Sequence, residues 1–91
     1  MSQYAVIGLG SFGATAAREL LRLGHDVIGI DSCAKYVDQL ANELTYAAIA
    51  DATDEQALRE LNVESCDAVL VAIGENLEAS ILCVLHLKTI G

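Results

Sequence analysis

The sequence predicts an α/β protein with a Rossmann-like, doubly wound parallel sheet in the strand order 3-2-1-4. Strand-like and helix-like segments alternate along the 91 residues, a glycine-rich turn joins the first strand to the first helix, and an acidic residue ends the second strand. Crossovers between parallel strands are right-handed, which makes this strand order the natural one. The order normally continues with two more strands, so we expect residues 1–91 to be one domain truncated at its C-terminal end.

The first half of the chain is predicted to form two strands and two helices in alternation. In order, they are Tyr4–Ile7, Ser11–Leu23, Val27–Ile30 and a helix through Tyr36, Val37, Leu40 and Ala41. Both strands are short apolar runs, which is typical of strands buried on both faces of a sheet. The first helix carries Ala16, Leu20 and Leu23 on one stripe. It ends at Gly24, and Ser32 is the expected N-cap of the second helix.

The second half of the chain repeats the alternation. In order, the predicted elements are Tyr46–Ala50, a helix that ends near Leu61, Ala68–Ile73 and Asn76–Lys88. Thr53 or Asp54 is the expected N-cap of the third helix. The fourth strand is predicted from six consecutive apolar residues. The last helix is apolar on nearly every side, so we expect further strands and a partner subunit to cover it.

The composition excludes several classes of protein. Thirteen acidic residues against five basic ones give a net charge of −8, which leaves too few cations for a nucleic-acid binding face. Binding to an anionic membrane surface is unfavourable for the same reason. A hydrophobic content of 54% is too high for a disordered chain. The longest apolar runs, near Ala68–Ile73 and Ile81–Leu85, are much shorter than the roughly 20 residues that span a bilayer.

The cysteines and the N-terminus indicate a cytoplasmic protein. Cys33, Cys66 and Cys83 form an odd set without CxxC spacing, which argues against a disulfide framework and a zinc ribbon. We expect each of them to be a small buried hydrophobic residue. The first residues lack the basic region and apolar core of a secretory signal.

A GxGxxG motif, GLGSFG at residues 8–13, lies between a predicted strand and a predicted helix. The first glycine permits a tight turn, the second lets the backbone approach a pyrophosphate, and the third lets the helix pack on the sheet. The unpaired N–H groups and partial positive charge of a helix N-terminus also suit phosphate. The predicted phosphate-binding residues are Gly8, Gly10, Ser11, Phe12 and Gly13.

Asp31 ends the second predicted strand, 23 residues after Gly8. An acidic residue at this position accepts hydrogen bonds from ribose hydroxyls and repels a 2′-phosphate. Asp31 therefore favours NAD or an ADP-type nucleotide over NADP. The alternative interpretation is an aspartate that caps a helix or stabilises a turn.

Two later segments end at the same edge of the predicted sheet as the glycine turn. Asp51, Ala52 and Thr53 follow the third strand, where residues commonly border the adenine. Capping of the next helix explains Asp51 and Thr53 equally well. Gly74 and Asn76 follow the fourth strand and are predicted to approach the phosphates or the second nucleoside.

Several motifs together resemble the RCK (KTN, TrkA-N) domain family. They are Tyr4–Gly13, Gly24–Val27, Ile30-Asp31, Asp51–Asp54 and Ala72–Asn76 with the following Glu78-Ala79-Ser80. The resemblance covers nearly all of the chain, in order. It implies a nucleotide-binding regulator of bacterial potassium channels and Trk/Ktr uptake systems, and not an enzyme.

The resemblance also implies cofactors, partners and a location. Such domains bind NAD(H), ATP or ADP, and the bound nucleotide changes the shape of a ring of dimers. The ring lies under a membrane-embedded potassium-translocating subunit. We therefore expect a cytoplasmic protein, peripheral at the inner face of the cell membrane, that self-associates as a dimer or a ring, octamers included. The family's last two strands and exchanged dimer helix are absent from residues 1–91.

The family pattern implies a place in the site for each matching residue. Phosphate contacts fall to Gly8, Gly10, Gly13, Gly74 and Asn76, the ribose contact to Asp31, and adenosine or adenine contacts to Ser32, Asp51, Ala52 and Thr53. One residue departs from the pattern: many ATP-sensing relatives carry arginine where this chain has Ser11. A hydroxyl lacks the reach and charge of arginine for a terminal phosphate. This difference favours NAD(H) or a shorter adenine nucleotide over ATP.

Two other functions fit the glycine turn and Asp31. One is the cofactor-binding part of an NAD-dependent dehydrogenase whose catalytic domain is missing, and a weaker one is an adenosylmethionine binder, which the phosphate-binding turn disfavours. No acid–base or nucleophile pair stands out, because a helix end explains His25 and a buried or interface position explains His86. The segments Asp51–Asp54 and Gly74–Asn76 favour the regulator.

Overall fold

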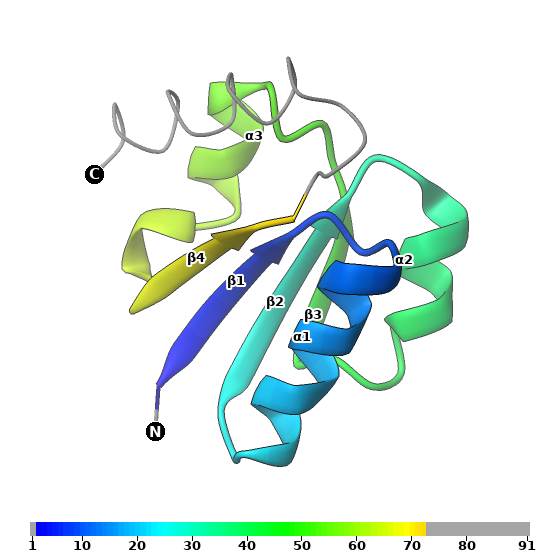
Figure 1. Cartoon of the computed structure of the whole chain (residues 1–91). Helices are drawn as coiled ribbons and strands as arrows, with labels where there is room; N and C mark the ends of the chain where they lie inside the picture. Colours follow the sequence, from blue (N-terminus) through cyan, green and yellow to red (C-terminus); the bar gives the residue numbers. More distant parts are fainter. Residues whose placement is uncertain (1, 73–91) are drawn as a thin grey trace.

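The computed structural model describes residues 2–72, which contain four strands, three α-helices and a short 3-10 helix (Figure 1). In chain order these are β1 (Gln3–Ile7), α1 (Ser11–Arg22), β2 (Asp26–Asp31), α2 (Ala34–Leu40), β3 (Tyr46–Ile49), α3 (Glu55–Glu60), η1 (Val63–Ser65) and β4 (Ala68–Val71). The four strands are parallel and lie in the order β3-β2-β1-β4. The predicted fold class and strand order are confirmed.

The predicted elements within residues 2–72 are present, with small shifts at their ends. The 3-10 turn η1 was not predicted; it follows Asn62, whose backbone is left-handed with a φ of 57°. The predicted last helix, Asn76–Lys88, lies outside the described residues. So do the predicted site residues Gly74 and Asn76, and Ile73 at the end of the fourth predicted strand.

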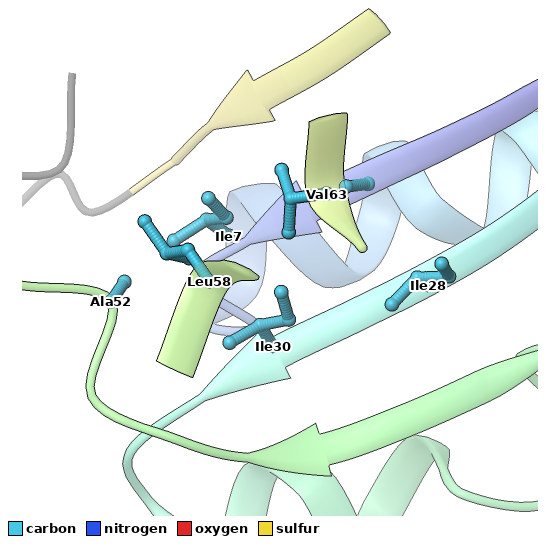
Figure 2. Close-up of a cluster of buried hydrophobic side chains, with 7 residues drawn as sticks. Ile7, Ile28, Ile30, Ala52, Leu58 and Val63 are labelled. Atoms are coloured by element: carbon cyan, nitrogen blue, oxygen red, sulfur yellow. The ribbon is translucent and has the colours of Figure 1, made fainter. Parts of the chain in front are cut away.

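The sheet is covered on both faces, and each face has its own core. Helices α1 and α2 lie over one face and α3 lies over the other (Figure 1). The α1-face core comprises Val6, Leu9, Ala17, Val27, Val37, Leu40 and Leu44. The α3-face core, drawn in Figure 2, comprises Ala5, Ile7, Ile28, Ile30, Ala52, Leu58 and Val63. Successive residues of β1 alternate between the two cores, which explains why this strand is apolar throughout.

The buried stripe of helix α1 overlaps only partly with the one predicted. Leu20 is half-buried and packs against the α1-face core, and Ala16 is half-buried, whereas Leu23 is 57% exposed. The fully buried residues of the helix are Gly13 and Ala17. The helix ends at Arg22, so Leu23 is its C-cap and no longer follows the helical repeat. Gly24 has a φ of +92°, and its N–H donates to the carbonyl of Leu21 at 2.9 Å. This left-handed glycine ends the helix as predicted.

The starts of α2 and α3 differ from each other in their caps. The expected cap of α2, Ser32, is wrong by one residue: Cys33 is the N-cap, and its side chain makes no capping hydrogen bond. Cys33 is therefore exposed and not buried as predicted, and Cys66 is half-buried. Helix α3 is capped by Asp54, whose carboxylate accepts a hydrogen bond from the N–H of Gln56 at 3.0 Å.

Asp67, the residue before strand β4, is joined to Gln3, the first residue of β1, by a pair of hydrogen bonds. The N–H of Asp67 donates to the carbonyl of Gln3 at 2.8 Å, and the carboxylate of Asp67 accepts from the N–H of Gln3 at 2.7 Å. This link joins residues 64 apart in sequence and is consistent with the register of the two strands, in which Tyr4 pairs with Ala68. Between residues 2 and 72, no helix has the length and apolar character needed to cross a bilayer.

Candidate functional site

Three of the segments predicted to bind a ligand meet at the carboxyl edge of the sheet. Strands β1, β2 and β3 are parallel and neighbouring, so the residues after Ile7, Asp31 and Ile49 emerge at one edge (Figure 1). This is where open α/β sheets bind ligands. The N–H of Ala50 donates to the carbonyl of Asp31 at 3.1 Å and extends the β2–β3 pairing to this edge.

The glycine turn needs two of its glycines for its own backbone. Gly8 has a φ of +99°, and its N–H donates to the carbonyl of Ile30 at 2.8 Å. A Cβ at Gly13 would lie 1.7 Å from the carbonyl oxygen of Gly8, so any side chain there would collide with the turn. The backbone geometry of the turn therefore accounts for the first and third glycines of the motif without any ligand.

Gly10 is different, because a Cβ at this position would meet no other atom of the described residues within 4 Å. Its φ of −70° is also available to other residues. Nothing in the described fold therefore requires a glycine at residue 10. The space beside Gly10 is open, which fits the close approach of a ligand to the backbone.

The N-terminus of α1 begins at this open position. Gly10 is the N-cap and supplies no side-chain hydrogen bond, and no acidic residue lies in the first turn. The geometry of an α-helix leaves the N–H groups of Ser11, Phe12 and Gly13 without partners inside the helix. Phe12, in the first turn of the helix, is 67% exposed. The helix start can hold an anion through its N–H groups and its positive dipole end.

Asp31 is hydrogen-bonded to the glycine turn. Its Oδ2 accepts a hydrogen bond from the N–H of Leu9 at 2.7 Å, and its Oδ1 accepts one from the N–H of Cys33 at 2.8 Å. The sequence analysis did not single out Leu9. Two features of the sequence point to it: Leu9 is an apolar residue inside the GxGxxG motif, and the buried strand β2 contains a glycine, Gly29, where a larger apolar residue is usual.

The segment Asp51–Thr53 forms a self-contained turn. The Oδ1 of Asp51 accepts hydrogen bonds from the N–H of Thr53 at 2.9 Å and from its hydroxyl at 2.6 Å. The hydroxyl of Thr53, followed by its N–H, holds the pKa of the Asp51 carboxyl below its usual value. Ala52 is only 7% exposed and belongs to the α3-face core, so its side chain is not available to a ligand.

Ser32 is exposed beside Asp31, between the carboxyl end of β2 and α2. The structure thus brings the glycine turn, Asp31 with Ser32, and the Asp51–Thr53 turn to one edge. None of these residues is basic, so an anion there would be held by backbone N–H groups and not by a cationic side chain. The described residues hold no group of three or more His, Cys, Asp or Glu side chains suited to a metal ion.

The family model described as the TrkA-N domain matches residues 4–91. The chain belongs to the TrkA-N family. The resemblance inferred from its motifs is therefore confirmed.

Two relatives of this TrkA-N domain come from Bacillus subtilis. It is 45% identical over 86 residues to Ktr system potassium uptake protein A, covering 94% of this chain and 39% of that protein. It is 43% identical over 89 residues to Ktr system potassium uptake protein C, covering 98% of this chain and 40% of that protein. The chain thus spans about two fifths of the length of these relatives.

A solved structure with the same fold is the NAD(P)-binding domain of an exopolyphosphatase-related protein from Archaeoglobus fulgidus. It has a TM-score of 0.87 and 32% sequence identity, and the match covers 100% of this chain and 68% of that one. This likeness supports the Rossmann-like assignment of the described strands and helices.

Proposed function

We propose that the chain is the nucleotide-binding regulatory domain of a potassium uptake system. Membership of the TrkA-N family and the likeness to two Ktr system potassium uptake proteins support the potassium assignment. The observation that carries the nucleotide assignment is the open helix start at Gly10, next to the hydrogen bond from Leu9 to Asp31. The helix start would bind phosphate, and Asp31 beside it would bind the ribose.

The phosphates of the nucleotide would bind the start of α1. Its N–H groups point out of the helix, and a ligand can approach the backbone at Gly10 without a steric barrier. Ser11 adds a hydroxyl and no positive charge. A terminal γ-phosphate therefore gains little over a diphosphate, so NAD(H) or ADP is preferred to ATP.

The ribose would bind Asp31. Each carboxylate oxygen accepts more than one hydrogen bond, so the bonds from Leu9 and Cys33 leave Asp31 capacity for ribose hydroxyls. The negative charge of Asp31 would repel a 2′-phosphate, which disfavours NADP(H).

The adenine would lie over the Asp51–Thr53 turn and Ser32. The hydrogen bonds within this turn hold its backbone in one shape, and Ala52 anchors it in the core. Gly74 and Asn76, outside the described residues, remain part of the proposal as contacts at the phosphate end of the nucleotide.

The proposed protein is a regulator and not an enzyme. It would act as a cytoplasmic subunit, peripheral at the membrane, in a dimer or ring beneath a membrane-embedded potassium-translocating subunit. A nucleotide changes potassium transport only if it binds one shape of this assembly more tightly than another. An NAD-dependent dehydrogenase also fits a Rossmann-like sheet, but the names of the two Ktr relatives favour the regulator.

Calorimetric titration of the intact protein with NADH, NADPH, ADP and ATP tests the proposal. We expect NADH and ADP to bind, NADPH to bind at least about tenfold more weakly, and ATP to bind no better than ADP. Asp31→Ala should abolish the binding of NADH, whereas Asp38→Ala, which removes an exposed carboxylate of α2, should not change it. Failure of all four nucleotides to bind would overturn the proposal.

Potassium uptake by cells that depend on this system tests the regulatory half of the proposal. We expect Asp31→Ala to remove the response of uptake to the cellular level of the bound nucleotide, and Asp38→Ala to preserve it. A protein that binds NADH or ADP normally while uptake ignores Asp31→Ala would instead indicate a nucleotide-binding role outside potassium transport.

A further inference from the structure

We propose that Asp31 is a positioning residue for the glycine turn in addition to its expected contact with the ribose. Its carboxylate holds the N–H of Leu9 and thereby fixes the turn before a nucleotide binds. The consequences for binding rest on the proposed function, whereas the effect on the turn does not.

The backbone around Leu9 is held to the end of β2 by two hydrogen bonds. Its N–H donates to the Oδ2 of Asp31 at 2.7 Å, across 22 residues of sequence. The preceding N–H, that of Gly8, donates to the carbonyl of Ile30 at 2.8 Å. Two successive N–H groups of the turn therefore bond to two successive residues at the end of β2.

The side chain of Leu9 is fixed as well. It is 2% exposed and lies in the α1-face core. A Cβ at Gly29 would lie 3.2 Å from both terminal methyl carbons of Leu9 and 2.3 Å from a methyl carbon of Leu44. Because Gly29 has no side chain, it leaves room beside β2 for these two leucines. The buried side chain of Leu9 thus anchors the turn in the core.

The carboxylate of Asp31 also reaches the start of α2. Its Oδ1 accepts the N–H of Cys33, the N-cap of that helix. One half-buried side chain therefore ties together the end of β2, the turn before α1 and the start of α2. Because Gly10 follows Leu9 and caps α1, fixing Leu9 also fixes the open helix start relative to Asp31.

This arrangement couples the two parts of the proposed nucleotide site. The group expected to bind the ribose also holds the backbone expected to bind the phosphates. Loss of Asp31 should therefore weaken the binding of a nucleotide even when the ribose lacks the hydroxyls that contact it. A residue that acted on the ribose alone would have no such effect.

Amide hydrogen exchange of the intact protein tests the effect on the turn without any ligand. In the wild type, the amide of Leu9 should be protected as strongly as that of Gly8, and the amide of Ser11 should exchange faster than both. In Asp31→Ala, which leaves no side-chain acceptor at this position, exchange at Leu9 should accelerate at least about tenfold while Gly8 remains protected. The control, Asp38→Ala, should change neither amide.

The proposal is overturned if Leu9 exchanges as fast as Ser11 in the wild type, or if Asp31→Ala leaves Leu9 protected. If Asp31→Ala lost protection at Gly8 and throughout the sheet, the variant would be unfolded, and the comparison of Leu9 with Ser11 in the wild type would decide. Failure of nucleotides to bind would affect only the proposed function, because this exchange measurement contains no nucleotide.

Titration with ADP and with 2′,3′-dideoxy-ADP tests the coupling. Wild type should bind ADP more tightly than the dideoxy form. Asp31→Ala should weaken binding of the dideoxy form by about tenfold, which corresponds to about 1.4 kcal/mol. Equal affinity of wild type and Asp31→Ala for the dideoxy form would mean that Asp31 acts through the ribose alone and would overturn the coupling.

Discussion

The starts of helices α1 and α3 lie at the same edge of the sheet but are built in opposite ways. At α3, Asp54 caps the helix through the N–H of Gln56, and the preceding turn satisfies its own polar groups through Asp51 and Thr53. At α1, the N-cap is a glycine without a capping side chain, and the first turn carries no acidic residue. The start of α3 is capped by its own side chain, and the start of α1 has no side-chain cap.

The capped start of α3 stabilises the fold, whereas we propose that the open start of α1 serves the binding of a ligand. A glycine N-cap is less stable than an aspartate N-cap by only about a few tenths of a kcal/mol, so the open start of α1 costs the domain little. The same contrast exists between two glycines of one motif, since Gly13 is required by contact with Gly8 and Gly10 by nothing in the described fold. Gly10, which the described fold does not explain, is where we propose that a phosphate approaches the backbone.

Gly13→Ala should cause the largest change. The added methyl would lie 1.7 Å from the carbonyl oxygen of Gly8, so the helix or the turn must move. We expect the free energy of unfolding to fall by about 3 kcal/mol or more, as in severe overpacking. Urea denaturation checks this, with Thr15→Ala on the exposed face of the same helix as the control. A Gly13→Ala protein of wild-type stability would show that the turn does not contact α1 so closely.

Gly10→Asp should close the open helix start. A carboxylate at the N-cap can accept N–H groups of the first turn and would place a negative charge where the phosphates are proposed to bind. We expect NADH affinity to fall by about tenfold or more and stability to hold or rise slightly. Gly10→Asn, which caps without a charge, separates the electrostatic part by calorimetry. Unchanged NADH affinity in both variants would argue against binding at α1.

Asp54→Ala should open the closed helix start. Loss of the bond to Gln56 N–H should lower the free energy of unfolding by about 1 kcal/mol, and Asp54→Asn should restore most of it. Because the cap serves α3 alone, NADH affinity should stay within a factor of about two of the wild type. Loss of NADH binding in Asp54→Ala at full folding would place the ligand at α3.

Thr53→Val should cause the smallest change. The hydroxyl of Thr53 is the main cause of the lowered pKa of Asp51, so its removal should raise that pKa toward the usual aspartate value. A lowered pKa in the folded state means that the turn is stabilised above the unfolded-state pKa and loses this contribution as the pH falls through the folded-state pKa. Carbon NMR titration of the Asp51 carboxyl group measures both values. An unchanged pKa in Thr53→Val would show that the backbone N–H of Thr53 alone sets it.

The features that the sequence predicted well are those determined by neighbouring residues. Alternating apolar runs with helical crossovers between them led to the strand order, because handedness leaves little choice once the elements are known. Gly24 and Asp54 were recognised at helix ends for similar reasons, since a left-handed glycine and an N-cap aspartate act within one turn.

The features that the sequence did not predict depend on distant backbone groups. The bond from Leu9 to Asp31 joins residues 22 apart, and the bond from Gln3 to Asp67 joins residues 64 apart. The N-cap of α2 is Cys33 and not Ser32, and the N–H of Cys33 donates to the carboxylate of Asp31, which the sequence did not reveal. The exposure of Leu23 follows from the helix end at Arg22, which the periodic stripe alone did not reveal.

Calorimetric titration of the intact Gly10→Ala protein with NADH tests the central claim most directly. A Cβ at this position meets no atom of residues 2–72 within 4 Å, so the variant should fold with a loss of stability below about 1 kcal/mol. The methyl group would nevertheless fill the space in which the phosphates approach the backbone. We expect thermal unfolding close to that of the wild type and NADH affinity reduced by about tenfold or more. Wild-type affinity for NADH in a normally folded Gly10→Ala protein would contradict a nucleotide site at the start of α1.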